Sequence, residues 1–191
     1  MPALPSLRRL LLASAFAIPA AAPHAATKTA DASHDFDFEI GTWKTHVTRR
    51  LHPLSGSNEW VELDGTSVVR KVLDGRANTV ELDISGPSGH ISGLAMRFYD
   101  ASARQWSIHY ASLDAGQLTP PLFGRFKDGR GEFHGQDTLA GRSIFVRFVI
   151  TCATHDTCRF EQSYSDDGGQ HWETNWIATD TRVASASGTP E

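Results

Sequence analysis

Short runs of β-prone residues alternate with turn-forming residues from Phe36 to near the end of the chain. The runs are rich in Val, Ile, Phe, Thr, Tyr and Trp, and Gly, Asp or Pro separates them about every dozen residues, which is typical of antiparallel sandwiches and barrels. No long stretch has the apolar period of an amphipathic helix. The pattern therefore predicts an all-β fold, an antiparallel up-and-down meander of about nine or ten strands linked mostly by hairpins.

A meander with this many strands is expected to close into a barrel, because closure leaves no strand edge exposed. A short helical turn over 35–40 is expected to lead into it. The expected strands are 42–51, 59–63 continued or re-formed at 67–73, 79–84, 91–99, 105–113, 122–126, 131–137, 143–151, 158–164 and 172–181.

The segment from Ser165 to Trp172 fits the Asp-box pattern Ser-x-Asp-x-Gly-x-x-Trp. In this hairpin turn the Asp side chain closes the turn, Gly supplies a positive φ, and the aromatic ring anchors the hairpin to the body of the fold. The motif occurs once and no internal repeat accompanies it, which argues against a propeller. It predicts a β-hairpin and carries no chemistry.

Side chains alternate across a strand, so the strand expected over 143–151 has two distinct faces. The apolar face is the better candidate for the interior, and it consists of Ile144, Val146, Phe148 and Ile150. Pairing Cys152 with Cys158 across the next hairpin sets Val146 opposite Tyr164. This register turns Tyr164 and the residues in phase with it inward.

The same register, carried through the Asp-box hairpin, sets Tyr164 beside Glu173 and Gln162 beside Asn175. Buried polar groups need partners, so these four residues either form an internal network or face a ligand and water. They are our candidate site, and a solvated face or a satisfied structural network is the alternative. A slip of one residue turns a different set inward, namely Trp172, Thr174 and Trp176.

Polar residues also interrupt other apolar strands. Trp106, Ile108 and Tyr110 share one face of the strand over 105–113 and are expected in the core, with Tyr110 also a candidate ligand contact. His109 faces the other way and is expected to be structural or exposed. Arg97 and Arg147 are expected to point outward in ion pairs, Arg147 with nearby Glu161. An inward arginine would instead indicate an anionic ligand or a paired carboxylate.

The first residues, 1–26, have the layout of a secretion signal. Arg8 and Arg9 precede an apolar run over 10–22, small residues follow, and no acid occurs before Asp31. The run is too short for a comfortable membrane span, although an uncleaved N-terminal anchor is the alternative. We therefore expect a periplasmic or secreted bacterial protein with no stable membrane anchor after processing. The Ser- and Ala-rich segment over 183–191 is expected to be a disordered tail.

Charge and cysteine content narrow the function classes further. The formal net charge is −4, and removing the two arginines of the signal makes it more negative, which disfavours nucleic acid as a partner. Cys152 and Cys158 are the only cysteines, and an even count in an exported chain predicts a disulfide. A metal site that includes His155 between them is the alternative, but no fourth ligand is evident.

A glycine and a tryptophan open the first long strand, in Gly41-Thr42-Trp43. This Gly-x-Trp resembles the mark of the calycin superfamily, which includes lipocalins and fatty-acid-binding proteins, where the Trp plugs one end of the barrel. From about 34 to 182 the chain resembles an uncharacterised family of exported bacterial domains that are predicted to form calycin-like barrels. The further motifs of that resemblance are Phe98-Tyr99-Asp100 leading to Trp106, Gly124-Arg125-Phe126, Asp128-Gly129 and Ser165 to Trp176. The resemblance implies the fold and no particular activity.

The haem-binding nitrobindin-like barrels resemble the chain in strand number and in the early Gly-x-Trp. Their glycine-rich extension of that motif is missing, since Lys44-Thr45-His46 follows Trp43 here. Haem also needs an axial ligand, and His109 and His171 are the candidates late in the chain. No cofactor or metal is expected, and haem remains an alternative.

The function expected from these features is binding of a small, partly apolar molecule in the barrel. The residues expected to line or close the cavity are Trp43, Tyr110, Gln162, Tyr164, Glu173 and Asn175. One alternative is an enzyme that acts on a small hydrophobic or sugar-like molecule with Glu173 as its acid/base group. Another is a structural module with a packed, dry interior.

Overall fold

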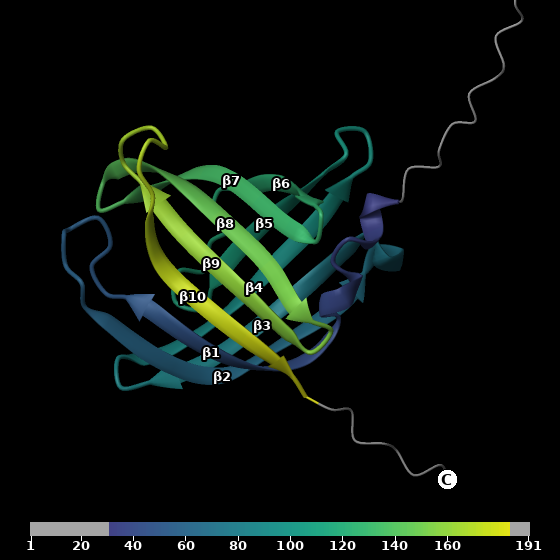
Figure 1. Cartoon of the computed structure of the whole chain (residues 1–191), viewed down its shortest axis with the longest axis horizontal. Helices are drawn as coiled ribbons and strands as arrows, with labels where there is room; N and C mark the ends of the chain where they lie inside the picture. Colours follow the sequence, from purple (N-terminus) through teal and green to yellow (C-terminus); the bar gives the residue numbers. More distant parts are fainter. Residues whose placement is uncertain (1–30, 184–191) are drawn as a thin grey trace, which may run out of the picture. The chain divides into compact units, whose positions relative to one another are not determined.

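The computed structural model describes residues 31–183, so the predicted signal peptide over 1–26 and all but the first residue of the predicted tail over 183–191 lie outside the described residues. Ten antiparallel strands follow one another around a closed barrel, which β1 and β10 complete by pairing (Figure 1). The predicted closed meander is confirmed. No helix of the described part is long and apolar enough to cross a membrane.

Three short 3-10 helices accompany the strands, and the second of them accounts for the helical turn predicted over 35–40. The helices are η1 (Ala32–His34), η2 (Asp37–Glu39) and η3 (Leu73–Gly75). The strands are β1 (Gly41–Arg50), β2 (Trp60–Val72), β3 (Ala77–Gly86), β4 (Gly89–Asp100), β5 (Gln105–Ser112), β6 (Leu122–Lys127), β7 (Arg130–Leu139), β8 (Arg142–Thr154), β9 (Thr157–Ser165) and β10 (Glu173–Arg182).

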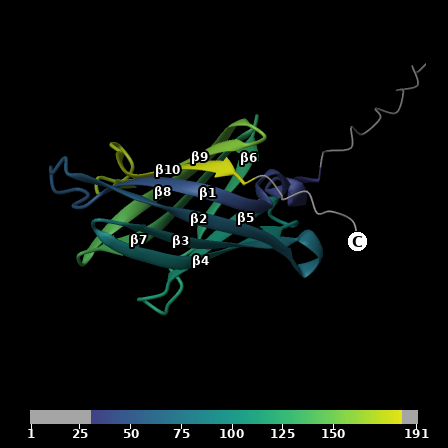
Figure 2. The ribbon, with the colours of Figure 1, turned by 90° about the horizontal axis from the view of Figure 1, so that it is seen from below.

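The strand predicted over 59–63 and continued or re-formed at 67–73 is a single continuous strand, β2. Gly65 in its middle allows the backbone of β3 to approach, because a Cβ at this position would lie 2.0 Å from the carbonyl oxygen of Asp83. A larger residue would push the two strands apart, so the curvature of this wall depends on the glycine. Figure 2 shows β3 and β4 on one side of the barrel and β9 and β10 on the other.

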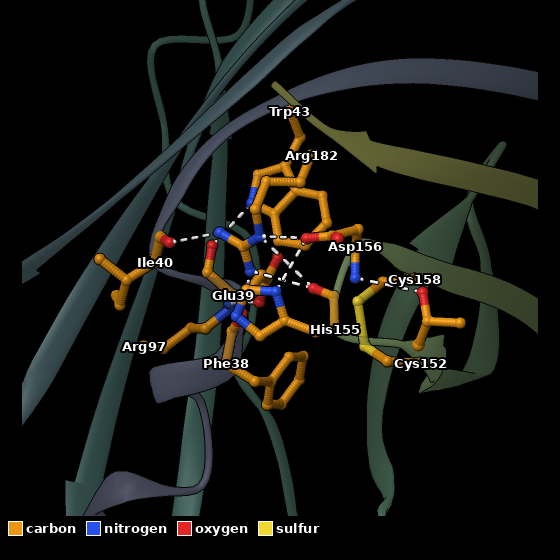
Figure 3. The surroundings of a disulfide bond; sticks show 11 residues. Phe38, Glu39, Ile40, Trp43, Arg97, Cys152, His155, Asp156, Cys158 and Arg182 are labelled. Carbon is orange, nitrogen blue, oxygen red and sulfur yellow. Dashed lines mark hydrogen bonds and ion pairs between the residues drawn. A yellow bond between two sulfur atoms is a disulfide. The ribbon is translucent and has the colours of Figure 1, made fainter. Parts of the chain in front are cut away.

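The segment that contains η1 and η2 plugs one end of the barrel, which we call the closed end. Phe36 from this segment is 1% exposed and meets the ring of Trp106 edge-on, with ring centres 4.9 Å apart. The indole nitrogen of Trp43 donates a hydrogen bond of 2.7 Å to the carbonyl oxygen of Glu39. The guanidinium of Arg182 lies 4.0 Å from the centre of the Trp43 ring (Figure 3). Aromatic packing and hydrogen bonds therefore hold the plug in place.

The predicted outward ion pair of Arg97 is wrong, because its side chain points into the barrel and is 3% exposed. Its guanidinium forms a two-pronged ion pair with the carboxylate of Glu39, which is also buried. The guanidinium also lies 4.3 Å from the centre of the Phe36 ring. The partner carboxylate thus comes from the plug, and the pair ties η2 to β4 without a ligand.

A second carboxylate is buried close to this pair. Asp180 on β10 is 5% exposed and accepts a hydrogen bond from the hydroxyl of Thr45. Burial raises the pKa of Asp180 to about 7, and the negative charge of Glu39 adds to the rise, while the Thr45 hydrogen bond and Arg97 oppose it. The buried carboxylates of Glu39 and Asp180 therefore lie close to the guanidinium of Arg97 in the interior of the closed end.

The Asp box forms the predicted turn between β9 and β10. Asp167 accepts hydrogen bonds from the amides of Gln170 and His171, each at 3.0 Å. The bonds from the His171 amide, the His171 ring and the Ser165 hydroxyl lower the pKa of Asp167 well below the usual range. Gly168 and Gly169 have the positive φ values of 78° and 86° that the turn requires. The side chain of Trp172 then anchors the hairpin on the outer face of the barrel.

Arg147 points outward as predicted, but its predicted partner is wrong. Its guanidinium lies 4.7 Å from the centre of the Trp172 ring, whereas Glu161 pairs with Arg159 at 2.6 Å. The whole of β9 lies between β8 and Trp172 in the sequence, so the spacing of residues within a strand could not predict this contact. The stacked pair fixes the hairpin to β8.

Cys152 and Cys158 form the predicted disulfide, which joins β8 to β9 (Figure 3). The register that this pairing predicted is confirmed, because Phe148 lies opposite Gln162 and Val146 lies opposite Tyr164. Both sulfur atoms are bonded to each other, so the alternative metal site with His155 loses two of its three ligands.

Exchanging Asp180 for Asn should change how stability depends on pH. An acid whose pKa rises from 3.8 to about 7 on folding binds a proton more tightly in the native state. The free energy of unfolding of the unmodified protein should therefore fall by on the order of a few kcal/mol as pH rises through this window. Asp180→Asn should remove most of that fall, as measured by urea denaturation at pH 5 and pH 8.

The control for this measurement is Asp114→Asn, which changes an exposed carboxylate in the segment after β5. This variant should keep the pH dependence of the unmodified protein. If the free energy of unfolding of Asp180→Asn fell between pH 5 and pH 8 as much as that of the unmodified protein, the raised pKa of Asp180 would be contradicted.

Exchanging Arg97 for Met should destabilise the protein by about 3–5 kcal/mol, because the carboxylate of Glu39 is left buried without a partner. Arg97→Met combined with Glu39→Gln should recover most of this loss. The exposed pair of Arg70 and Glu81 on the outer surface provides the control, and Arg70→Met should cost less than about 1 kcal/mol. Similar losses for the two arginine variants in thermal unfolding would show that the plug does not depend on the pair.

Candidate functional site

Polar side chains gather inside the barrel in the half away from the plug. We call the end of the barrel where β1 ends and β10 begins the far end. Several inward-facing side chains near it keep partial exposure to solvent, although strands surround them on all sides; they are Arg49, Tyr110, Asp137, Gln162 and Tyr164. Inward-facing residues at the closed end, such as Trp43 and Trp106, are 1% exposed. The inward-facing polar side chains of the far half are therefore more exposed to solvent than these two rings.

Gln162 is at the centre of this group. Its amide nitrogen donates one hydrogen bond of 3.0 Å to the hydroxyl of Tyr164 and another of 3.0 Å to the side-chain oxygen of Asn175. The three residues come from β9 and β10, on either side of the Asp-box hairpin. The sequence analysis therefore predicted correctly that these three side chains lie together. The strand register on which that prediction rested differs from the observed one.

A β-bulge between Thr174 and Trp176 explains the difference. The predicted register holds at Glu173, which lies opposite Tyr164, but Gln162 lies opposite Trp176 instead of Asn175. Asn175 is the extra residue of the bulge, and Trp176 turns inward to pack on the core. The bulge thus directs both Asn175 and Trp176 toward the interior, where a regular strand would direct only one of them.

Asn175 has an unusual position for an amide. Its side chain is 4% exposed, its oxygen accepts the bond from Gln162, and its side-chain nitrogen has no hydrogen-bond partner among the described residues. An unpaired buried donor typically costs about 1–3 kcal/mol. Such a group needs a partner that the described residues do not supply, and a bound water, ion or ligand can provide it.

Two tyrosines and an arginine complete the site. Burial raises the pKa of both Tyr110 and Tyr164, and the positive charge of Arg49 acts on both phenols in the opposite direction. Asp137 adds to the rise at Tyr164. Arg49 and Asp137 are therefore close enough to the phenols to act on them electrostatically, from β1 and β7.

The position of Tyr110 depends on a glycine of the neighbouring strand. Its ring lies over Gly93, where a Cβ would come within 2.2 Å of the phenol oxygen. The backbone of Tyr110 is held by Thr119, whose amide donates a bond of 2.7 Å to its carbonyl oxygen. This contact matters because β5 and β6 pair over three residues only, so the segment after β5 covers the wall at this point.

Glu173 and Trp43 have positions that differ from the other predicted site residues. The carboxylate of Glu173 accepts a bond of 2.7 Å from the amide of Leu54 and lies 3.6 Å from the guanidinium of Arg50. It therefore fixes the connection between β1 and β2 to the start of β10. Trp43 closes the opposite end of the barrel, as the resemblance implied, and does not contact the polar group.

Arg49 is the site residue that the sequence analysis missed. Strand alternation contained the signal, because Arg49 is in phase with Trp43, Thr45 and Val47, which all point inward. Arg49 was not selected, because it lies near the end of a strand and beside Arg50, a pattern that is typical of surface residues.

The two histidines considered for haem lie outside the barrel. His109 points away from the interior and packs against Phe98, with ring centres 6.0 Å apart. His171 lies in the Asp-box turn, where its ring nitrogen is 2.6 Å from the carboxylate of Asp167. Among the described residues, every strand histidine is out of phase with the inward-facing side chains, so the interior offers haem no histidine ligand.

A shallow pocket of about 420 Å³ lies at the closed end, beside the plug. It is lined by Asp35, Phe38, Phe126, Asp128, Gly129 and Cys152. The pocket contains no network of hydrogen-bonded side chains, and its lining does not include any residue of the polar group. We therefore take the polar group in the far half as the candidate site.

No family model matches the chain, and no curated protein matches it. Among solved structures, the S-type phycobiliprotein lyase from Guillardia theta is similar, with a TM-score of 0.54 and 15% sequence identity. The alignment covers 78% of this chain and 91% of the lyase. At this identity the similarity shows the fold alone, and that fold is a closed, calycin-like barrel of ten strands.

Proposed function

We propose that the chain is a binding protein that holds a small, partly apolar molecule in the far half of its barrel. The observation that carries this proposal is the buried side-chain nitrogen of Asn175, which has no partner among residues 31–183. Most buried polar groups in native interiors are paired. A ligand that accepts a hydrogen bond there supplies the missing partner.

The surroundings of this donor fit a molecule with both polar and apolar parts. Gln162 and Tyr164 offer polar contacts, while Val146 on β8 and Trp176 on β10 offer apolar ones. Binding sites for small molecules combine an apolar lining with a few placed polar groups in this way. The calycin-like architecture supports the proposal, because barrels of this size are wide enough to hold one small ligand.

The barrel carries the ligand rather than transforming it. Glu173, the residue considered as an acid/base group, is occupied by Leu54 and Arg50. We also propose that the protein is exported, on the basis of the signal-like sequence over 1–26 and the disulfide between Cys152 and Cys158.

Binding can be measured with the neutral apolar dye N-phenyl-1-naphthylamine, whose fluorescence increases in an apolar site. The dye should bind the unmodified barrel with one molecule per chain. Ala95→Phe should weaken binding by about tenfold or more, because Ala95 faces inward opposite Tyr110 and the added ring would extend into the region proposed for the ligand. The neighbouring Leu94 points the other way, so Leu94→Phe should leave binding unchanged.

Circular dichroism should show that both variants keep their strand content. An unmodified protein that does not bind the dye, or the two variants binding it equally well, would favour a packed, dry interior and would overturn the proposal.

A further inference from the structure

Hydrogen-bond donors exceed acceptors at the candidate site. An amide nitrogen has two N–H groups, and Gln162 uses both on Tyr164 and Asn175. Each of these partners therefore receives a bond and keeps its own donors. The hydroxyl of Tyr164 and the side-chain nitrogen of Asn175 donate to no atom of residues 31–183.

Arg49 adds the strongest donor to this group. Its guanidinium carries five N–H groups, and neither a hydrogen bond nor an ion pair to it occurs within the described part of the chain. The other arginines with inward-facing side chains, Arg97 and Arg182, are both held by carboxylates or carbonyl oxygens. Arg49 thus brings a positive charge into the barrel for which the protein supplies no contact partner.

Two carboxylates face the same region, and neither neutralises Arg49 by contact. Glu173 on β10 is held by Leu54 and Arg50. Asp137 on β7 accepts a bond of 2.7 Å from the amide of Thr138 and forms no ion pair in the described structure. A ligand oxyanion can therefore meet Arg49 without displacing a protein carboxylate from it.

We infer that the ligand bound in the barrel is an apolar molecule with one carboxylate or a similar oxyanion, which Arg49 pairs with while Asn175 and Tyr164 donate hydrogen bonds to it. This inference rests on the proposed function and specifies the chemical class of its ligand. Arginine suits this role because its planar group can bond both oxygens of a carboxylate, and the partly buried surroundings strengthen the interaction. The apolar part of the ligand lies against Val146 and Trp176.

The test compares 2-naphthoate with 2-naphthamide, two molecules of nearly the same shape that differ in charge. Isothermal titration calorimetry with the full chain measures each directly at pH 7. The unmodified protein should bind naphthoate about tenfold or more tightly than naphthamide, since a hydrogen bond to a charged group is worth that much. Asn175→Leu should weaken the binding of naphthoate more than the binding of naphthamide. The variant removes a hydrogen-bond donor, and the carboxylate of naphthoate is the stronger acceptor.

Arg49→Gln should abolish the preference for naphthoate while naphthamide binding stays within about twofold, because the side chain keeps donors but loses its charge. Arg125→Gln is the matched control, since Arg125 lies on the outer face of β6 and should not affect either molecule. Asp137→Asn should tighten naphthoate binding, because it removes a negative charge that acts on Tyr164 in the same region. Unfolding temperatures show whether each variant remains folded.

The outcomes separate this inference from the proposed function. Equal binding of naphthoate and naphthamide by the unmodified protein, or a preference that survives Arg49→Gln, would overturn the anionic ligand and leave a binding barrel for neutral molecules. Binding of neither molecule, together with no binding of the apolar dye, would overturn both.

Discussion

The buried ion pair between Arg97 and Glu39 determines how this barrel is closed. Two charges are taken out of water at the same end, and each would be costly without the other. Glu39 belongs to the short segment before β1, whereas Arg97 belongs to β4, so the pair connects the start of the chain to the middle of the wall. Phe36 stacks beneath the guanidinium and brings the aromatic core with it. One buried ion pair, packed among aromatic rings, thus holds the closed end together.

In the far half of the barrel, hydrogen-bond donors outnumber the acceptors that the chain supplies. Its polar side chains have donors left over, and its one inward arginine, Arg49, has no partner among residues 31–183. Arg97 and Arg49 both point inward, but only for Arg97 does the chain itself provide a carboxylate in contact. This asymmetry distinguishes a group that maintains the fold from a group that awaits a ligand, and the physical criterion is whether the chain itself supplies a carboxylate for the arginine.

Strand alternation and turn chemistry were sufficient to predict most of the fold and part of the site. The cysteine pair fixed the register of β8 on β9, and from it Gln162 and Tyr164 were correctly turned inward. The bulge at Asn175 could not be predicted, because one extra residue in a strand leaves little trace in the apolar pattern. Arg97 was placed outward for a related reason. Its partner lies in a segment far away in sequence, and only the folded plug brings the two together.

We expect a ligand to occupy the far half of the barrel and to leave the plug unchanged. Backbone NMR of the isotope-labelled protein titrated with 2-naphthoate measures this directly. We expect shifts at the amides of Arg49, Tyr110, Tyr164 and Asn175, and none at Trp43 or Arg97. Shifts confined to the plug, or to the pocket between Phe38 and Phe126, would contradict the account.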